Sequence, residues 1–293
     1  MDILTNYTFQ IVALGSVLLA VAAAPVGAFS VYKGQSLIGD AIGHSTFPGI
    51  ILAYMAFATR SPVILLAGAI LAGAASYALI QLAHRDKRLG LGLDANLAIF
   101  LSGFFGLGMA LKSFIQGNPD YAGASQAGLG TYIFGQAAYM LEADVLLIAA
   151  ISALVLTLLL LFYKELKLFV FDAEYAEVVG LPCRLLNLLL LVMTIAVIGI
   201  GIKAVGAILI SSFLIIPCVA ANQWSNNFAR VLLLSSLIGA VSALVGTYIS
   251  TLEQGMSTGP SIILVASLIA FFSIVFGTKG ILGSVLKRRR THG

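Results

Sequence analysis

The sequence predicts an all-helical membrane protein that crosses the bilayer many times, and three observations support this fold class. Of its 293 residues, 60% are hydrophobic and 10% are charged, and the mean hydropathy is +1.05. Soluble domains usually carry about 25% charged residues, so a water-soluble enzyme is disfavoured. The apolar residues gather in segments of about 20, the length that a helix needs to cross a bilayer. The net charge of +4 does not indicate nucleic-acid binding, because the basic residues are spread between these segments.

Nine apolar segments are candidate transmembrane helices. The sixth and seventh are separated only by the stretch Gly201-Ile202-Lys203, where we expect a tight hairpin. Several segments are short or rich in glycine, so eight spans are an alternative to nine. The segments cover residues 9–32, 37–58, 62–83, 92–115, 144–163, 185–202, 204–222, 231–250 and 260–278.

The basic residues predict the orientation of these spans. If the connections alternate between the two sides, most lysines and arginines fall on one side, and only Arg60, Lys112 and Lys203 fall on the other. Short cytoplasmic connections carry an excess of Lys and Arg. We therefore expect a multi-pass protein of the inner (plasma) membrane with a cytoplasmic C-terminus.

Two connections are longer than a turn requires. On the expected outer side, residues 116–143 contain an apolar patch at 129–141 that is too short to span, which predicts an interfacial or re-entrant helix. On the expected inner side, residues 164–184 form a charged amphipathic stretch that we expect Pro182 to end. This stretch is the one inner connection that has the character of a folded contact surface. Its candidate contact residues are Asp172, Glu174, Glu177, Gly180 and Pro182.

Asp40 and His44 are the ionisable residues with the strongest functional signal, since they lie at the start of the second apolar segment. Ionisable groups inside membrane segments cost about 2.5–3.5 kcal/mol on insertion scales, which makes them functional candidates. Residues four apart share one face of a helix, and a carboxylate with an imidazole suits Mn, Fe or Zn. One Asp and one His are too few to hold a dication, so a second copy of the chain would supply the other half.

A structural alternative for this pair is open. Asp40 could be the N-cap of its helix, a role that Asp favours, and His44 could be an interior histidine bonded to a carbonyl. Gly39 and Gly43 form a small-xxx-small pattern that permits close contact between helices.

Missing motifs narrow the function further. The sequence has no G-x-x-x-x-G-K-[ST] phosphate-binding loop. We therefore expect that this chain does not hydrolyse ATP unaided.

Five blocks of sequence together resemble the permeases of metal-ion ABC transporters, the ABC-3 family, which import manganese, zinc or iron. The blocks occur in the family's order and cover most of residues 10–278. They read SLIGDAIGHSTFPGI, FGQAAYMLEADVLL, FDAEYAEVVGLPCRLLNLLLL, VGAILISSFLIIPCVAAN and TGPSIILVASLIAFFSIVF.

This resemblance implies a transport subunit that is not itself an enzyme, with ATP hydrolysis in a partner chain. It further implies a single permease domain over residues 1–293, with a type II-like importer architecture and 164–184 as the cytoplasmic coupling segment. The implied partners are a second permease chain, identical or not, an ATP-binding ABC subunit and an extracellular metal-binding lipoprotein. Asp40 and His44 match the pathway acid and histidine of the family. The implied cargo is Mn²⁺, Zn²⁺ or Fe²⁺, and the GDA-x-x-H-x-x-x-PG pattern favours manganese, then zinc.

Two other classes of function compete with an ABC importer. A secondary transporter would use Asp40 as a proton or sodium site, and its transport would survive ATP depletion. A non-transporting membrane assembly subunit would tolerate Asp40→Ala and His44→Ala without any change in metal uptake.

Overall fold

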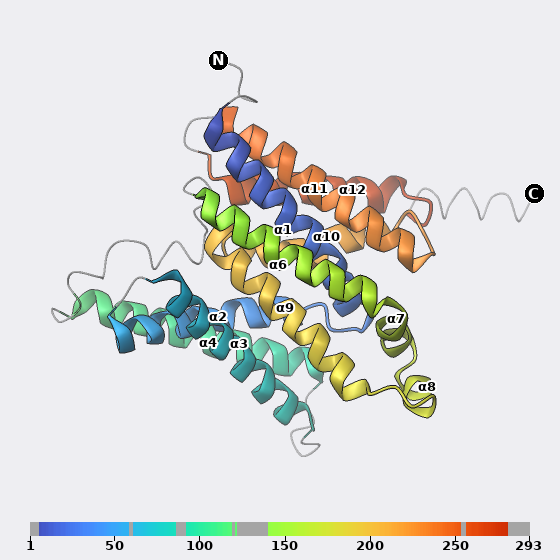
Figure 1. Cartoon of the computed structure of the whole chain (residues 1–293), viewed down its shortest axis with the longest axis horizontal. Helices are drawn as coiled ribbons and strands as arrows, with labels where there is room; N and C mark the ends of the chain where they lie inside the picture. Colours follow the sequence, from blue (N-terminus) through green and yellow to red (C-terminus); the bar gives the residue numbers. More distant parts are fainter. Residues whose placement is uncertain are drawn as a thin grey trace, which may run out of the picture. The chain divides into compact units, whose positions relative to one another are not determined.

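The computed structural model describes residues 6–58, 61–85, 92–118, 121, 140–252 and 256–280, and every regular element within them is a helix (Figure 1). The all-helical fold class is therefore confirmed for this part of the chain. The helices are α1 (Tyr7–Tyr32), α2 (Ile38–Phe57), α3 (Pro62–Arg85), α4 (Leu93–Gly117), α6 (Glu142–Leu161), α7 (Tyr163–Phe171), α8 (Ala173–Val178), α9 (Cys183–Val205), α10 (Ala207–Asn222), α11 (Phe228–Leu252) and α12 (Thr258–Phe276).

Seven of the helices within the described ranges are long and apolar enough to cross a membrane: α1, α3, α4, α6, α9, α11 and α12. The two other predicted segments also form helices, but α10 has only 16 residues and α2 carries several polar residues. Seven candidate spans are thus established, and the total of eight or nine stays a prediction. The predicted re-entrant segment falls almost entirely on residues 122–139, which lie outside the described residues.

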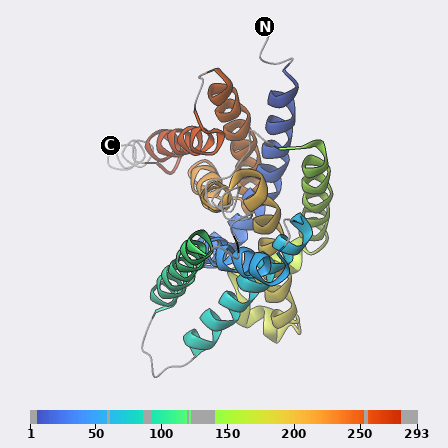
Figure 2. The ribbon, with the colours of Figure 1, turned by 90° about the vertical axis from the view of Figure 1, so that its left-hand side faces the viewer.

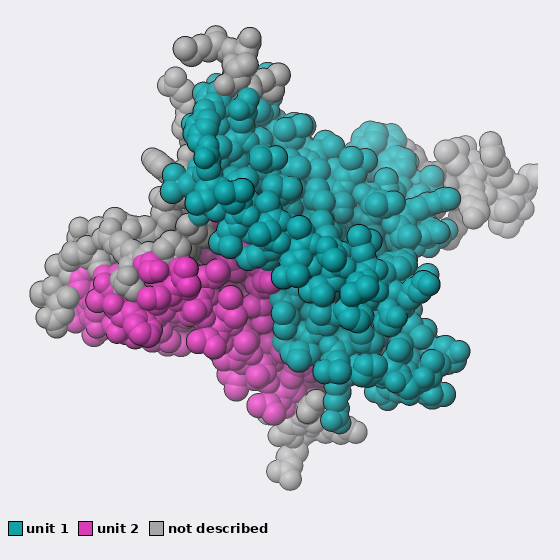
Figure 3. Space-filling model, in the orientation of Figure 1, with its two compact units in different colours: residues 1–36, 137–193, 212–293 teal, residues 37–136, 194–211 magenta. Residues whose placement is uncertain are grey.

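The chain divides into two compact units, shown in separate colours in Figure 3. The first unit combines residues 1–36, 137–193 and 212–293, and the second combines 37–136 and 194–211. Helices α9 and α10 each contribute to both units, because the boundaries at 193 and 211 fall inside them.

Helix α1 is the central helix of the first unit. Asn6 caps it by accepting a hydrogen bond from the Thr8 N–H at 3.0 Å. Figure 2 shows α1 between α6 and α11, and it packs against both. Gly27 contacts the backbone of Leu214 in α10, so closely that a Cβ atom would lie 1.9 Å from the Leu214 carbonyl oxygen. This packing explains why α1 is buried along most of its length.

The second unit fixes α2 against α3 and α4. Gly49 and Gly68 bring the backbones of α2 and α3 together, since a Cβ atom at Gly49 would lie 2.2 Å from the Gly68 carbonyl oxygen. Nearby, the Ser45 hydroxyl bonds to the Ser76 hydroxyl at 2.7 Å. The close approach predicted for Gly39 and Gly43 is wrong at Gly43, where an added Cβ would meet nothing within 4 Å. The sequence pattern could not reveal which glycines face the neighbouring helix.

The connection between α9 and α10 lies later than predicted. Helix α9 continues to Val205, and Gly206 alone separates it from α10. Gly206 has a φ of +87°, which glycine adopts without the steric penalty that a side chain brings. The hairpin is therefore at Gly206 and not at the predicted stretch Gly201-Ile202-Lys203, which continues the helix.

A pair of glycine substitutions tests the α2–α3 contact. Gly49→Ala should lower the free energy of unfolding by about 1–3 kcal/mol, because its methyl group overpacks the interface. Gly43→Ala is the matched control and should leave stability unchanged or raise it by up to about 1 kcal/mol, since alanine favours the helix. Thermal unfolding of the purified variants measures both effects. Equal melting temperatures for the two variants would contradict the contact.

Candidate functional site

The side chains of Asp40 and His44 meet on α2, as their spacing predicts. Asp40 lies in the first turn of the helix, and its Oδ1 is 3.4 Å from Nε2 of His44. The two side chains keep 30% and 19% of their surface exposed, respectively. The N-cap is Leu37, so the alternative in which Asp40 caps the helix is wrong. The pair therefore has no capping role and keeps access to a ligand.

Neighbouring helices of the second unit hold this pair in place. The ring of Phe105 in α4 meets His44 edge to face, with centroids 5.1 Å apart and an angle of 83° between the planes. Phe105 also lies 6.5 Å from the ring of Phe47, one turn of α2 beyond His44. The Ser211 hydroxyl in α10 donates a hydrogen bond to the Ile208 carbonyl oxygen of its own helix at 3.1 Å. The contact with Phe105 limits the rotation of the His44 ring, and the contact with His44 orients the Asp40 carboxylate.

The other polar residues on the same turns of α2 have partners inside the protein. The Ser45 hydroxyl lies within hydrogen-bond distance of the Ala41 carbonyl oxygen, at 2.6 Å, and of the Ser76 hydroxyl. The Thr46 hydroxyl donates a hydrogen bond to the Gly43 carbonyl oxygen at 2.6 Å. Since these hydroxyls are satisfied by the helices, they do not compete with the carboxylate and the imidazole for a ligand.

One carboxylate and one imidazole make only part of a metal site. Structural zinc sites are almost always four-coordinate, and catalytic ones use three protein ligands. The described residues contain no group of three or more His, Cys, Asp or Glu side chains that could hold a metal ion. Within the part of the chain that the structure describes, Asp40 and His44 thus form an incomplete set of metal ligands.

The predicted contact segment at 164–184 forms α7, α8 and the start of α9 (Figure 1). Asp172 caps α8 by accepting a hydrogen bond from the Tyr175 N–H at 2.9 Å. The helix ends through Gly180, whose φ is +88°: its N–H bonds to the Glu177 carbonyl, and the Leu181 N–H bonds to the Ala176 carbonyl. This pair of bonds is a Schellman motif.

The predicted role of Pro182 as the helix stop is wrong. Helix α8 has already ended at Val178, and the Pro182 carbonyl accepts hydrogen bonds from the N–H groups of Leu185 and Leu186 in the first turn of α9. Proline has no N–H to lose at this point, so it begins the next helix without leaving a donor unpaired.

Helix α8 exposes most of its surface within the described structure. Ala176 is its only buried residue, whereas Val178 is 83% exposed. Glu174 and Glu177 are also exposed, next to the exposed ring of Tyr175. Acidic and apolar side chains thus share one surface, which is typical of a segment that contacts a partner.

Lys33, at the end of α1, anchors the base of this segment, and the sequence analysis missed that role. Its Nζ lies 4.7 Å above the ring centroid of Phe169 in α7 and donates a hydrogen bond to Oδ1 of Asn187 in α9. Burial lowers the pKa of Lys33 to about 8. The sequence shows only a lysine after an apolar segment, which we had used to predict orientation.

Comparisons with known proteins identify the family. The model of the ABC 3 transport family matches residues 5–277. The chain belongs to the ABC 3 transport family. The resemblance seen in the five sequence blocks is thereby confirmed, and this ABC 3 chain is a multi-span membrane subunit of a transport family.

Its relatives are named as metal transport proteins. The chain is 39% identical to the zinc transport system membrane protein TroC of Treponema pallidum, over 99% of this chain and 96% of that protein. It is 38% identical to the manganese transport system membrane protein MntC of Bacillus subtilis, over 96% of this chain but only 65% of the longer relative. The structure of PsaBC from Streptococcus pneumoniae in complex with Fab is similar, with a TM-score of 0.81, 26% identity and 94% of both chains covered.

Substitutions at Gly180 test the end of α8 in the ABC 3 chain. Gly180→Ala should destabilise this turn by about 1–2 kcal/mol, because a side chain is unfavourable at positive φ. Amide hydrogen exchange over residues 173–185 should therefore become faster. Gly180→Asn is the conservative control and should exchange at an intermediate rate, since Asn adopts this region more readily. Wild-type exchange in the alanine variant would contradict the motif.

The lowered pKa of Lys33 predicts a pH dependence of stability. Between about pH 8 and pH 10.5, the unfolded chain binds more protons at this lysine than the folded chain, so stability rises with pH in this window. Lys33→Met keeps the apolar stem and removes the titration. At pH 7.5 the variant should have a higher melting temperature than the wild type. This difference in melting temperature should become smaller as the pH rises from 8 to 10. A constant difference would contradict the burial of a charged lysine.

Proposed function

We propose that this chain is the permease subunit of an ATP-driven importer for divalent transition-metal ions, working by alternating access. The observation that carries the proposal is the contact between Asp40 and His44 on α2, in a chain of the ABC 3 transport family. Both groups keep part of their surface exposed, while the hydroxyls beside them are paired within the protein. This arrangement leaves one oxygen donor and one nitrogen donor for a passing ion.

The proposed cargo is manganese first, then zinc and iron. Carboxylate and imidazole donors are compatible with all three ions, and the two curated relatives are named for zinc and for manganese. The metal is substrate and not a resident cofactor, so the site must release it. A site with few protein ligands serves that purpose because it binds less tightly than a closed four-ligand site.

A second permease copy would complete the pathway. Two chains would contribute two carboxylates and two imidazoles, so that two negative charges face the dication and compensate for its lost hydration. The proposal includes eight or nine spans per chain, a single permease domain over residues 1–293, a type II-like architecture and a cytoplasmic C-terminus in the plasma membrane.

The segment 164–184 would couple the permease to the ATPase. Helix α8 presents the exposed acidic and apolar side chains that such a contact needs, and Lys33 ties α7 to α1 and α9. ATP would be bound and hydrolysed by the partner chain, and an extracellular metal-binding lipoprotein would deliver the ion. The proposed contact residues are Asp172, Glu174, Glu177, Gly180 and Pro182.

Reconstitution of the permease with its ATPase tests the metal site. Asp40→Asn and His44→Gln should each reduce manganese uptake by at least about tenfold, since even outer-shell partners of metal sites change affinity by about 10–100-fold. Uptake of radioactive manganese into proteoliposomes measures the effect, with zinc and iron compared in parallel.

Matched variants control for the chemical change. His84→Gln alters an exposed histidine of α3, and Asp144→Asn alters a carboxylate at the start of α6. Both should transport at the wild-type rate. Full ATP-coupled uptake by Asp40→Asn would refute the assigned site, and uptake that survives ATP depletion would refute the ABC mechanism.

Charge reversal on α8 tests the coupling segment. The double change Glu174→Lys with Glu177→Lys should abolish co-purification of the ATPase, because it reverses the charge of the proposed contact surface. The corresponding glutamine pair keeps the shape and should lose only part of the binding. Unchanged co-purification of the lysine pair would place the ATPase contact elsewhere.

A further inference from the structure

Phe228, the first residue of α11, is the centre of a cluster of aromatic rings in the first unit. Its side chain is buried. The ring meets Phe29 and Tyr32 of α1 edge to face, with centroids 4.9 and 5.0 Å apart, respectively. From α7, Phe171 meets it edge to face at 5.2 Å, and Tyr163 lies nearly parallel to it at 6.4 Å. One side chain of α11 thus contacts rings of both α1 and α7.

Tyr32 connects this cluster to the end of α10. Its ring lies 5.3 Å from the ring of Phe171, and its hydroxyl donates a hydrogen bond to Oδ1 of Asn222 at 2.9 Å. The same oxygen accepts a hydrogen bond at 3.1 Å from Nζ of Lys279, which follows shortly after α12. The Lys279 Nζ also donates to the Ser225 carbonyl oxygen at 2.8 Å. One amide oxygen therefore ties the ends of α10 and α12 to α1.

The cluster lies directly against the proposed ATPase contact at 164–184. Tyr163 is the first residue of α7 and Phe171 is the last, so both ends of this helix contact Phe228. Coupling between separate parts of a protein is carried by packed side chains and hydrogen bonds, and closely packed side chains transmit strain. A shift of α7 would therefore displace Phe228 and, with it, the first turn of α11.

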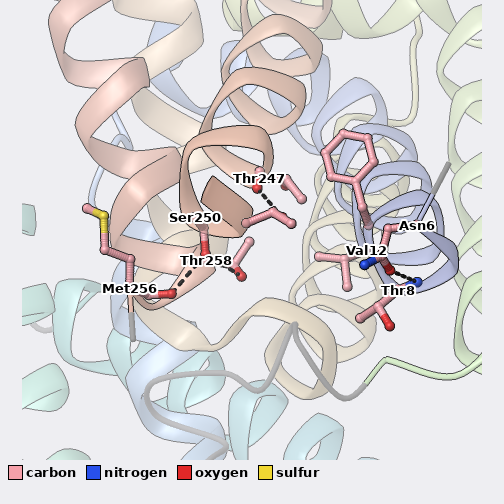
Figure 4. Close-up of a pocket in the computed structure, with 9 residues that line it drawn as sticks. Asn6, Thr8, Val12, Thr247, Ser250, Met256 and Thr258 are labelled. Carbon is pink, nitrogen blue, oxygen red and sulfur yellow. Dashed lines mark hydrogen bonds between the residues drawn. The ribbon is translucent and has the colours of Figure 1, made fainter. Parts of the chain in front are cut away.

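The opposite ends of α1 and α11 are packed less completely. There the two helices border a cavity of about 340 Å³ together with the start of α12. Figure 4 shows Thr8 of α1 across this space from Ser250 of α11 and Thr258 of α12. Side chains that border unfilled space lose contacts on that side. A tilt of α11 that starts at Phe228 would thus meet less resistance at this far end.

We propose that Tyr32 and Phe228 are positioning residues that transmit movement of the coupling segment to α10, α11 and α12. This inference rests on the proposed function of the chain as an ATP-driven permease with its ATPase contact at 164–184. The Phe228 ring passes a displacement of α7 to α11. The Tyr32 hydroxyl passes it through Asn222 to α10 and to the residues after α12. Without these links, the ATPase would still hydrolyse ATP, but fewer metal ions would cross the membrane for each ATP.

The ratio of manganese ions transported to ATP hydrolysed, measured in proteoliposomes with the complete complex, tests the role of Tyr32. Tyr32→Phe removes the hydroxyl and keeps the ring, and Lys279 still donates to Asn222. No acceptor is left without a partner, so the melting temperature should stay close to that of the wild type. The ratio should fall about fivefold, the equilibrium factor that corresponds to one ordinary hydrogen bond.

Tyr163→Phe is the matched control for this change. Tyr163 belongs to the same cluster, but its hydroxyl makes no hydrogen bond within the described residues. The variant should therefore keep the wild-type ratio of ions to ATP.

A second pair of variants tests the role of Phe228. Phe228→Leu keeps an apolar side chain but removes the four ring contacts, and it should also lower the ratio of ions to ATP. Phe272→Leu is the control, because it changes an exposed ring of α12 that stacks on Phe276. Since uptake is counted for each ATP hydrolysed, a variant that only reduces the amount of folded complex keeps the wild-type ratio.

An unchanged ratio in Tyr32→Phe or in Phe228→Leu would overturn the role of that residue and leave the proposed function intact. An equal loss of uptake and of ATP hydrolysis also leaves the ratio unchanged and would show a structural role instead. If the wild-type complex itself shows no ATP-driven manganese uptake, the proposed function fails, and this inference fails with it.

Discussion

The hydrocarbon core of a bilayer offers no hydrogen-bond partner to a polar group, and this constraint shapes the candidate membrane spans that the structure describes. Backbone groups are satisfied within the helices, so the fold consists of helices throughout the described residues. Hydroxyl side chains follow the same rule: Ser45, Ser235, Ser242 and Ser273 each donate to a carbonyl three or four residues earlier in their own helix. These hydroxyls are therefore not available to a ligand.

Helix α2 illustrates what this constraint implies for the site. It falls short of the apolar character of the other long helices because it carries Asp40, His44 and two hydroxyls. Its position depends on contacts with α3 and α4 instead of on hydrophobicity alone. The backbones of α2 and α3 approach closely at Gly49 and Gly68, and the His44 imidazole lies beside Phe105 of α4. The glycine contact with α3 and the Asp40–His44 pair thus involve different residues of the same helix.

The segment outside the spans follows a different physical rule. In α8 the helix ends are closed by local hydrogen bonds: Asp172 caps the first turn, and Gly180 allows the carbonyls of the last turn to find partners. A six-residue helix has little stability of its own, so these caps and the buried side chains of α7, Leu166 and Phe169, hold its shape. An exposed helix with closed ends can present acidic and apolar side chains without unfolding.

The sequence by itself determined the fold class, the family and the pairing of Asp40 with His44, because hydropathy, segment length and the spacing of four residues depend only on local order along the chain. Tertiary structure decided the rest. Which glycine meets a neighbouring helix and how Lys33 is buried against Phe169 both depend on contacts between residues far apart in sequence. Such contacts arise when helices pack, and no local pattern encodes them.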